Sequence, residues 1–266
     1  MQTRDIIKKW YEKISFPKEY DFEFYRALEE IEVDPTATIE SYDLECTDGK
    51  KNLLYYLYFC EATMKKYEAA GLSEELLVAT MQDIVVYTKV WTELKGELYL
   101  GQLSWLKRHH MLTLFWLGRL QFCFGKSIRD SADGYFKKDE DIIEIHIPRG
   151  KSLDIEECHA SIAMAKEFFA RNFPTYKYRF ITCNTWMLGD TTLAMLSPES
   201  NIAKFAAMFT MVSFNTGDGL LPFVFGWGAK REDIDKYPAT TSLQKKAKAA
   251  IERGEELRTG YGYIEI

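Results

Sequence analysis

The 266 residues carry a formal net charge of −6 and are 47% hydrophobic. This apolar content suffices for a packed core and excludes a disordered chain, while the acidic balance argues against nonspecific nucleic acid binding, which needs a basic surface. The five cysteines are scattered without the CxxC spacing of a zinc knuckle or the pattern of a disulfide framework, so we expect a reducing, cytoplasmic location.

Membrane association is not expected from the sequence. The most apolar run, residues 111–118, is far too short to cross a bilayer, and Lys107, Arg108 and Arg119 bound it. Charged residues interrupt every apolar run in residues 1–14, so we expect no signal peptide. Neither a membrane nor nucleic acid is therefore an expected partner.

The first hundred residues have helical periodicity. Ile6, Trp10 and Ile14 fall on one face of an amphipathic helix at the start of the chain. Ser73 is a predicted N-cap, and Gly96 should end the helix that Ser73 begins. The predicted helices cover residues 4–14, 23–31, 51–71, 72–96 and 101–118.

The periodicity then changes. Residues 119–124 and 141–148 alternate as two antiparallel strands, joined by a polar connection at 125–134. Helices are predicted over 154–173, 200–214 and 240–256, and strands over 178–188, 221–228 and 260–266. The sequence thus predicts an α+β protein, with a helical domain over residues 1–117 and a mixed sheet flanked by helices over residues 118–266.

The order of elements after residue 118 resembles the acyl-CoA-dependent N-acyltransferase fold. The chain is similar to a bacterial acyltransferase-like family that joins a helical N-terminal N-acyltransferase domain to a GNAT-like C-terminal domain. The stretches that carry this resemblance are residues 116–122, 146–154, 184–188, 197–205 and 241–262. The resemblance implies transfer of an acyl group from acyl-CoA, or from an acyl carrier protein, to an amine of a small molecule, with acyl-CoA as co-substrate and no permanently bound cofactor.

Residues 149–154 occupy the place of the loop that binds the acyl donor in this fold. Backbone amides at a helix N-terminus attract phosphate. Arg149 matches the family signature, whereas Ser152 and Asp154 replace its two small residues. Asp154 also fits a helix N-cap, in which role its carboxylate would compete with phosphate for the same amides. The candidate acyl-CoA contacts are Ile145, Ile147, Arg149, Gly150, Lys151, Ser152 and Trp186.

The candidate catalytic residues lie on two predicted strands. Strand alternation places Glu144 and His146 on one face, where either can act as the base that takes the amine proton. Alternatively, His146 satisfies a backbone carbonyl and Glu144 is solvated. Asn184 is a candidate for orienting substrate, and Trp186 either walls the acyl channel or belongs to the core. Among the histidines, His109 and His110 are adjacent in a predicted helix, so they point about 100° apart and predict no metal site.

Two functions therefore remain open. Many relatives of this fold carry a tyrosine that protonates the departing thiolate, but residues 200–214 contain none; Phe205 and Phe209 stand there instead. This departure, with those at Ser152 and Asp154, leaves as an alternative a non-catalytic GNAT-like binding or regulatory module that has lost the donor site. The helical domain could wall the acceptor pocket, form a homodimer surface, or do both.

Overall fold

The computed structural model describes residues 2–131 and 134–266. The chain divides into two compact units: residues up to Leu117 together with Pro148–Gly150, and Gly118–Ile147 together with Lys151–Ile266. The predicted polar connection at 125–134 includes residues 132 and 133, which lie outside the described residues. No helix in the described ranges is long and apolar enough to cross a membrane.

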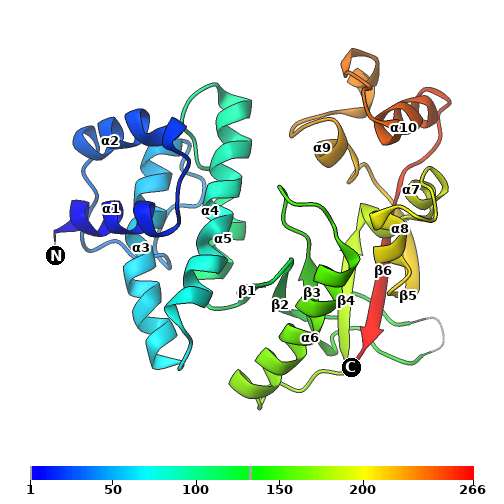
Figure 1. Ribbon diagram of the computed structural model, residues 1–266, viewed down its shortest axis with the longest axis horizontal. Coiled ribbons are helices and arrows are strands. Elements are labelled where there is room, and N and C mark those ends of the chain that lie inside the picture. The colour runs from blue at the N-terminus through cyan, green and yellow to red at the C-terminus, as the bar shows by residue number, and fades with distance from the viewer. Residues whose placement is uncertain (1, 132–133) are drawn as a thin grey trace. The chain divides into compact units, whose positions relative to one another are not determined.

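The first unit is helical, and α3 contacts the four other helices of this unit (Figure 1). Its helices are α1 (Thr3–Lys13), α2 (Asp21–Glu30), α3 (Gly49–Ala69), α4 (Glu74–Lys95) and α5 (Leu103–His110). The Ser73 side chain accepts from the Leu76 amide, and Gly96 ends α4 with a left-handed φ of 75°. The caps of α4 are therefore those that the sequence predicts.

The predicted helix over 101–118 is wrong in its second half. Helix α5 ends at His110, Leu112 has a φ of 55°, and residues 114–117 form strand β1 (Leu114–Leu117). The Trp116 amide donates to Thr80 Oγ1 of α4. A short apolar run fits a buried helix and a buried strand equally well, which explains the error.

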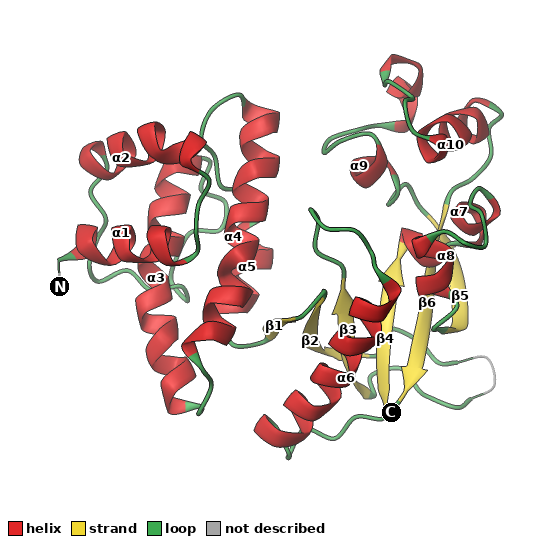
Figure 2. Ribbon diagram, viewed as in Figure 1, coloured by secondary structure: helices red, strands yellow, loops and turns green. Residues whose placement is uncertain are grey.

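A six-stranded mixed sheet has the order β1-β2-β3-β4-β6-β5 (Figure 2). Strands β2 and β3 pair antiparallel, β3 and β4 parallel, and β6 pairs antiparallel with both β4 and β5. The bounds are β2 (Leu120–Lys126), β3 (Asp141–His146), β4 (Phe180–Thr185), β5 (Thr210–Thr216) and β6 (Arg258–Glu265). The architecture is α+β, as the sequence predicts.

The two faces of this sheet are buried in different ways. On one face Phe124 of β2 packs edge-to-face against Phe169 of α6 (Ile155–Asn172), with ring centroids 5.2 Å apart. The opposite face carries a cluster formed by Phe136, Ile142, Phe180, Tyr261 and Tyr263. Alternation along β3 therefore puts Ile143 and Ile145 toward α6, and Glu144 and His146 toward the other face.

Three further elements differ from the sequence prediction. The predicted helix over 200–214 is a short helix α8 (Asn201–Ala206) followed by β5, because residues 210–216 pair with the edge of β6. The predicted strand over 221–228 begins instead as helix α9 (Leu221–Val224), with Pro222 in its first turn, where proline favours a helix. Strand β4 ends at Thr185, and Trp186–Leu188 form a 3₁₀ turn.

The C-terminal elements form a second small core. Helices α7 (Asp190–Ala194) and α10 (Ser242–Glu252) complete the unit, with a 3₁₀ helix at Arg231–Lys236. Trp186 packs with Leu220, Leu221, Ile251 and Leu257 in one buried cluster. This cluster fixes the end of β4 relative to α9 and α10.

Candidate active site

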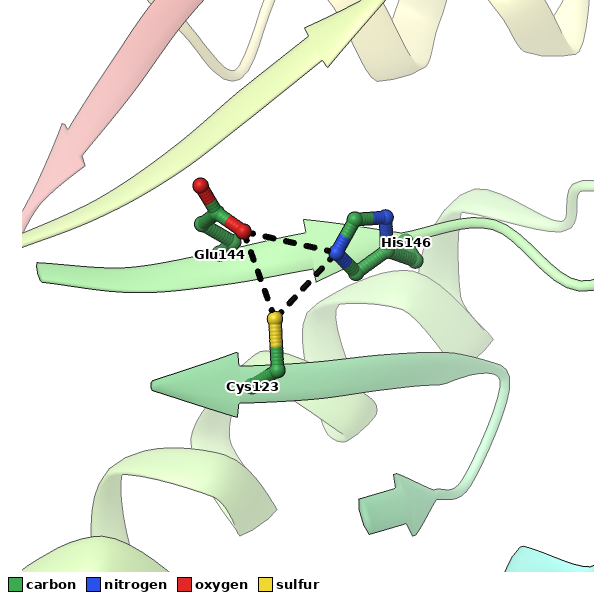
Figure 3. Close-up of side chains that lie close together, drawn as sticks. All are labelled: Cys123, Glu144 and His146. Atoms are coloured by element: carbon green, nitrogen blue, oxygen red, sulfur yellow. Dashed lines mark hydrogen bonds and ion pairs between the residues drawn. The ribbon is translucent and has the colours of Figure 1, made fainter. Parts of the chain in front are cut away.

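The side chains of Cys123, Glu144 and His146 meet on the face of the sheet opposite α6 (Figure 3). Glu144 and His146 are two residues apart on β3, and Cys123 of β2 is the direct cross-strand partner of Glu144. Their side chains share a face because alternate residues of a strand point the same way and paired residues point together. The structure therefore brings the two predicted base candidates together and adds a thiol.

The Cys123 sulfur, one Glu144 carboxylate oxygen and one His146 ring nitrogen lie close to one another. Cys123 Sγ lies 3.2 Å from His146 Nε2 and 3.4 Å from Glu144 Oε2. The Glu144 Oε2 to His146 Nε2 distance is 3.6 Å. Cys123 is fully buried, whereas the Glu144 and His146 side chains are 29% and 32% exposed. The thiol is thus buried beneath the cluster, whereas the carboxylate and the imidazole are partly exposed to solvent.

Gly125 makes room for the Glu144 side chain. A Cβ added to Gly125 would lie 2.7 Å from Glu144 Cγ and 2.8 Å from its Cδ. The carboxylate therefore lies over the backbone of β2, a position that any larger residue at 125 would block. The absence of a side chain at this position sets where the Glu144 carboxylate lies.

Two buried polar atoms flank the cluster without a hydrogen-bond partner among the described residues. Gln121 is paired across the strands with His146, and Thr182 is paired with Glu144. Gln121 Nε2 and Thr182 Oγ1 make no hydrogen bond, although the two residues are only 2% and 1% exposed. Buried polar groups are usually satisfied, so these atoms mark places where a bound group or water would be stabilised.

Helix α6 is capped at its N-terminus by Asp154, and the loop before it has backbone amides that the cap does not use. Asp154 Oδ1 accepts from the amides of Glu156 and Glu157 at 3.0 and 3.1 Å, which confirms the predicted N-cap. Arg119 is 5% exposed and donates through Nε to the Ser152 carbonyl and through Nη2 to the Lys151 carbonyl. Burial lowers the pKa of Arg119 below its ordinary value.

The backbone amides next to the Lys151 and Ser152 carbonyls are available to a bound anion. Within the described part of the chain, the amides of Lys151, Ser152 and Leu153 donate to no acceptor. Lys151 and Ser152 are exposed, and Ser152 Oγ accepts from Asn201 Nδ2 at 3.2 Å. The Asp154 carboxylate does not occupy these amides, so the capping role and anion binding at this loop are compatible.

Arg149 and Gly150 belong to the first unit rather than to the second. The Arg149 guanidinium is near Tyr87 and Glu93 of α4, and burial lowers its pKa despite their opposing effect. Gly150 is exposed and has a φ of 95°, a conformation that favours glycine. The candidate loop residues thus belong to two units, and Lys151, Ser152 and Leu153 are part of the second.

The other predicted contacts have ordinary structural places. Trp186 is 7% exposed within the C-terminal core and lies in the 3₁₀ turn rather than on β4. Asn184 is exposed on β4 opposite Tyr261. Ile145 is buried on the α6 side of the sheet, and Ile147 follows β3 half-buried. The role of these residues in donor binding stays a prediction.

The two adjacent histidines have separate partners inside the first unit. His109 Nε2 lies 3.1 Å from Asp83 Oδ2 of α4, which also accepts from Trp105 Nε1. His110 Nδ1 lies 2.8 Å from Thr63 Oγ1 of α3. The two imidazoles thus contact different helices of the first unit.

Sequence reasoning missed Cys123 and Arg119. The position of Cys123 opposite Glu144 depends on the β2–β3 register, and the connection between these strands is too long to set that register by turn type. Arg119 acts on carbonyls more than thirty positions ahead in the chain. In the sequence, only the strand alternation of residues 119–124 indicated that Cys123 shares a face with Gln121.

Comparison with known proteins identifies the family. Residues 5–112 match the model of the N-acyltransferase N-terminal domain, and residues 114–264 match the model of the GNAT-like C-terminal domain. The chain belongs to this family: an N-acyltransferase N-terminal domain followed by a GNAT-like C-terminal domain. The predicted resemblance is confirmed. No curated protein matches the chain.

Solved structures share the fold at low sequence identity. An acyltransferase mutant in complex with octanoyl-CoA is 17% identical, has a TM-score of 0.79, and is matched over 97% of this chain and 87% of that one. An acyltransferase in complex with decanoyl-CoA and teicoplanin is 19% identical, has a TM-score of 0.76, and is matched over the same shares. At this identity the likeness establishes the fold of the chain.

Proposed function

We propose that the chain transfers an acyl group from acyl-CoA to an amine of a small molecule. The observation that carries the proposal is the Glu144–His146 pair, partly exposed near the end of the strand that leads into the loop of unpaired amides. An acyl transferase needs a base for the amine and an anchor for the donor phosphates. The second unit supplies candidates for both: Glu144 and His146 as the base, and residues 151–153 as the anchor.

The loop is the candidate donor anchor. Amides of residues 151–153 precede the N-terminus of the 18-residue helix α6, whose dipole favours negative charge. Arg119 supports the amides of Ser152 and Leu153 by fixing the carbonyls on the other side of the same two peptide groups. The related structures that hold octanoyl-CoA and decanoyl-CoA support a thioester of medium chain length as donor. An acyl carrier protein would offer the same phosphopantetheine chemistry to this loop.

Glu144 and His146 act on the acceptor in this proposal. One of the pair takes a proton from the amine, whose nitrogen attacks the thioester carbonyl and forms a tetrahedral intermediate. The carbon–sulfur bond then breaks, the amide forms, and the thiolate of CoA takes up a proton. Because α8 carries no tyrosine, the thiolate takes this proton from whichever of Glu144 and His146 accepted it from the amine. Asn184, exposed on the neighbouring strand β4, would orient the acceptor.

The alternative is a non-catalytic GNAT-like module that has lost its donor site. It would be favoured if Asp154 occupied the loop amides. Asp154 instead caps the amides of Glu156 and Glu157 in the first turn of α6. The open amides of 151–153 therefore favour the enzyme, and the activity test below separates the two.

Release of CoA thiol tests the proposal. The full chain is mixed with octanoyl-CoA or decanoyl-CoA and a panel of primary amines that includes ethanolamine, benzylamine and glucosamine, and free thiol is followed with a chromogenic reagent. We expect amine-dependent release that falls at least about 100-fold in His146→Ala, with little change in the KM for the donor. His159→Ala, an exposed histidine on α6, is the matched control.

Two outcomes would decide against the proposal. Absence of amine-dependent release with every donor, while the protein is folded, would favour the non-catalytic module. Unchanged turnover in folded His146→Ala would remove His146 from the mechanism while leaving the donor site intact.

A further inference from the structure

We infer that Cys123, Glu144 and His146 form a binding site for a thiophilic divalent metal ion, with zinc as the best match. This inference goes beyond the proposed acyl transfer, and it concerns the same three side chains. It rests on the geometry of their donor atoms and on the mixed sulfur, nitrogen and oxygen chemistry. Cys123 has no part in the proposed transfer reaction.

The donor atoms are spaced like the ligands of a tetrahedral ion. Their separations are 3.2 Å for sulfur to nitrogen, 3.4 Å for sulfur to oxygen and 3.6 Å for nitrogen to oxygen. Zinc bonds of about 2.3 Å to sulfur and about 2.0–2.2 Å to nitrogen and oxygen, at the tetrahedral angle, give separations of about 3.4–3.6 Å. Two of the three separations fall within this range, and the sulfur-to-nitrogen separation needs to lengthen by only about 0.2–0.4 Å for the atoms to form one face of a zinc tetrahedron.

The arrangement differs from that of a nucleophilic triad. In such a triad the acid contacts the imidazole nitrogen that faces away from the nucleophile, so that the imidazole is oriented between them. Here the thiol and the carboxylate both approach the same atom, His146 Nε2. Three ligand atoms that converge on one point are arranged to bind a cation, whereas a triad arranges its groups in sequence for proton transfer.

The ligand set and its surroundings fit zinc. Thiolate and imidazole are ligands that favour zinc over magnesium or calcium, and three protein ligands leave a fourth position open. Paired strands β2 and β3 hold the ligands, and Gly125 leaves the space that the Glu144 carboxylate occupies. Gln121 Nε2 and Thr182 Oγ1, buried without partners among the described residues, flank the cluster and can stabilise a group at that position.

Metal binding would exclude acyl transfer. The ion would bind as Cys123 loses its thiol proton to solvent, and it would occupy both His146 Nε2 and the Glu144 carboxylate. Neither group could then accept a proton from an amine.

Cobalt substitution tests the site directly. The full chain is freed of metal with a chelator, titrated with Co²⁺ alone, and its absorption spectrum recorded. We expect one equivalent of Co²⁺ to produce a sulfur-to-metal charge-transfer band and tetrahedral visible bands. Competition with a chromogenic chelator then gives the affinity for Zn²⁺, with no acyl-CoA present.

Matched variants assign the ligands. Cys123→Ser should lose the charge-transfer band, and Glu144→Gln should keep it while its Zn²⁺ affinity falls roughly 10–100-fold or more. Cys46→Ser, which removes a half-buried thiol of the first unit, should leave both measurements unchanged. Thermal melts establish that each variant is folded, and Glu144→Gln still decides the question if Cys123→Ser is not.

The inference is overturned if folded wild type shows no charge-transfer band, or if folded Glu144→Gln binds Zn²⁺ as tightly as wild type does. Since the titration needs no substrate, failure here leaves the proposed transfer reaction standing. Absence of transfer in the chelated protein would in turn leave the metal site standing.

Discussion

The replacement Gly125→Ala tests whether the position of the Glu144 carboxylate matters for turnover. The new Cβ would lie 2.7 Å from Glu144 Cγ, 2.8 Å from Cδ and 3.0 Å from Oε1. Ordinary carbon–carbon contacts are about 3.5–4.0 Å, so the Glu144 side chain must move by roughly 1 Å. The carboxylate would then leave its place beside His146 and Cys123 without any loss of charge.

The magnitude follows from the displacement. A misplacement of roughly 1 Å at a reacting group can reduce turnover about 100-fold. We therefore expect kcat to fall roughly 10–100-fold, while the KM for acyl-CoA stays within about twofold because the loop at 151–153 is untouched. Alanine is tolerated in a strand better than glycine, so the folding free energy should change by less than about 1 kcal/mol.

Steady-state CoA thiol release, with thermal melts alongside, is the assay. Gly217→Ala is the matched control, because a Cβ at Gly217 meets no atom within 4 Å. If folded Gly125→Ala turns over as fast as wild type, the carboxylate position has no catalytic role and the site geometry described above does not explain activity.

Three other predictions concern stability and donor binding. Burial lowers the pKa of His110 to about 3 from an ordinary 6.5, with smaller contributions from His109 and Lys66, so only the unfolded chain binds this proton as pH falls below 6.5. His110 should therefore lower the free energy of unfolding by about 2 kcal/mol between pH 7 and pH 5. In urea unfolding, the stability of His110→Gln should fall by about 2 kcal/mol less than that of wild type over this pH range. An equal fall in both proteins would contradict the lowered pKa of His110. Asp154→Ala should lower the free energy of unfolding by about 1 kcal/mol, since two amides lose their cap; an unchanged urea midpoint would show that the cap is not stabilising. Arg119→Lys should raise the KM for acyl-CoA roughly 10-fold with a smaller effect on kcat, because one ammonium cannot hold both carbonyls of residues 151 and 152; a change in kcat alone would argue against a donor-loop role.

Local patterns predicted the elements whose signals are local. The caps at Ser73 and Asp154 and the alternation that pairs Glu144 with His146 follow from side-chain chemistry within a few residues. Long amphipathic helices in the first unit were likewise predictable, because their apolar stripes repeat over several turns.

The errors occurred where distant pairing decides the structure. Residues 210–216 contain no strong strand signal and become β5 through pairing with β6, where Gly262 lies against Phe209 and Met211. Leu114–Leu117 become a strand after the backbone turns at Leu112. In the candidate site, the contribution of Cys123 required the β2–β3 register, which no local pattern encodes.

The structure of the loop at residues 151–153 likewise includes a contact between residues far apart in the sequence. Arg119 donates to the carbonyls of Lys151 and Ser152 beside the open amides of residues 151–153, and these two hydrogen bonds span 32 and 33 positions in the chain. From the sequence, Asp154 and a phosphate were expected to compete for the same amides. The hydrogen bonds show that Asp154 accepts from Glu156 and Glu157 rather than from residues 151–153.

Calorimetric titration of the full chain with CoA and decanoyl-CoA tests the central claim, that the second unit binds an acyl-CoA donor at the loop before α6. We predict saturable binding of one equivalent, tighter for decanoyl-CoA than for CoA, and weaker in Arg119→Lys. No heat of binding with either ligand at millimolar concentration, from protein shown to be folded, would contradict the claim.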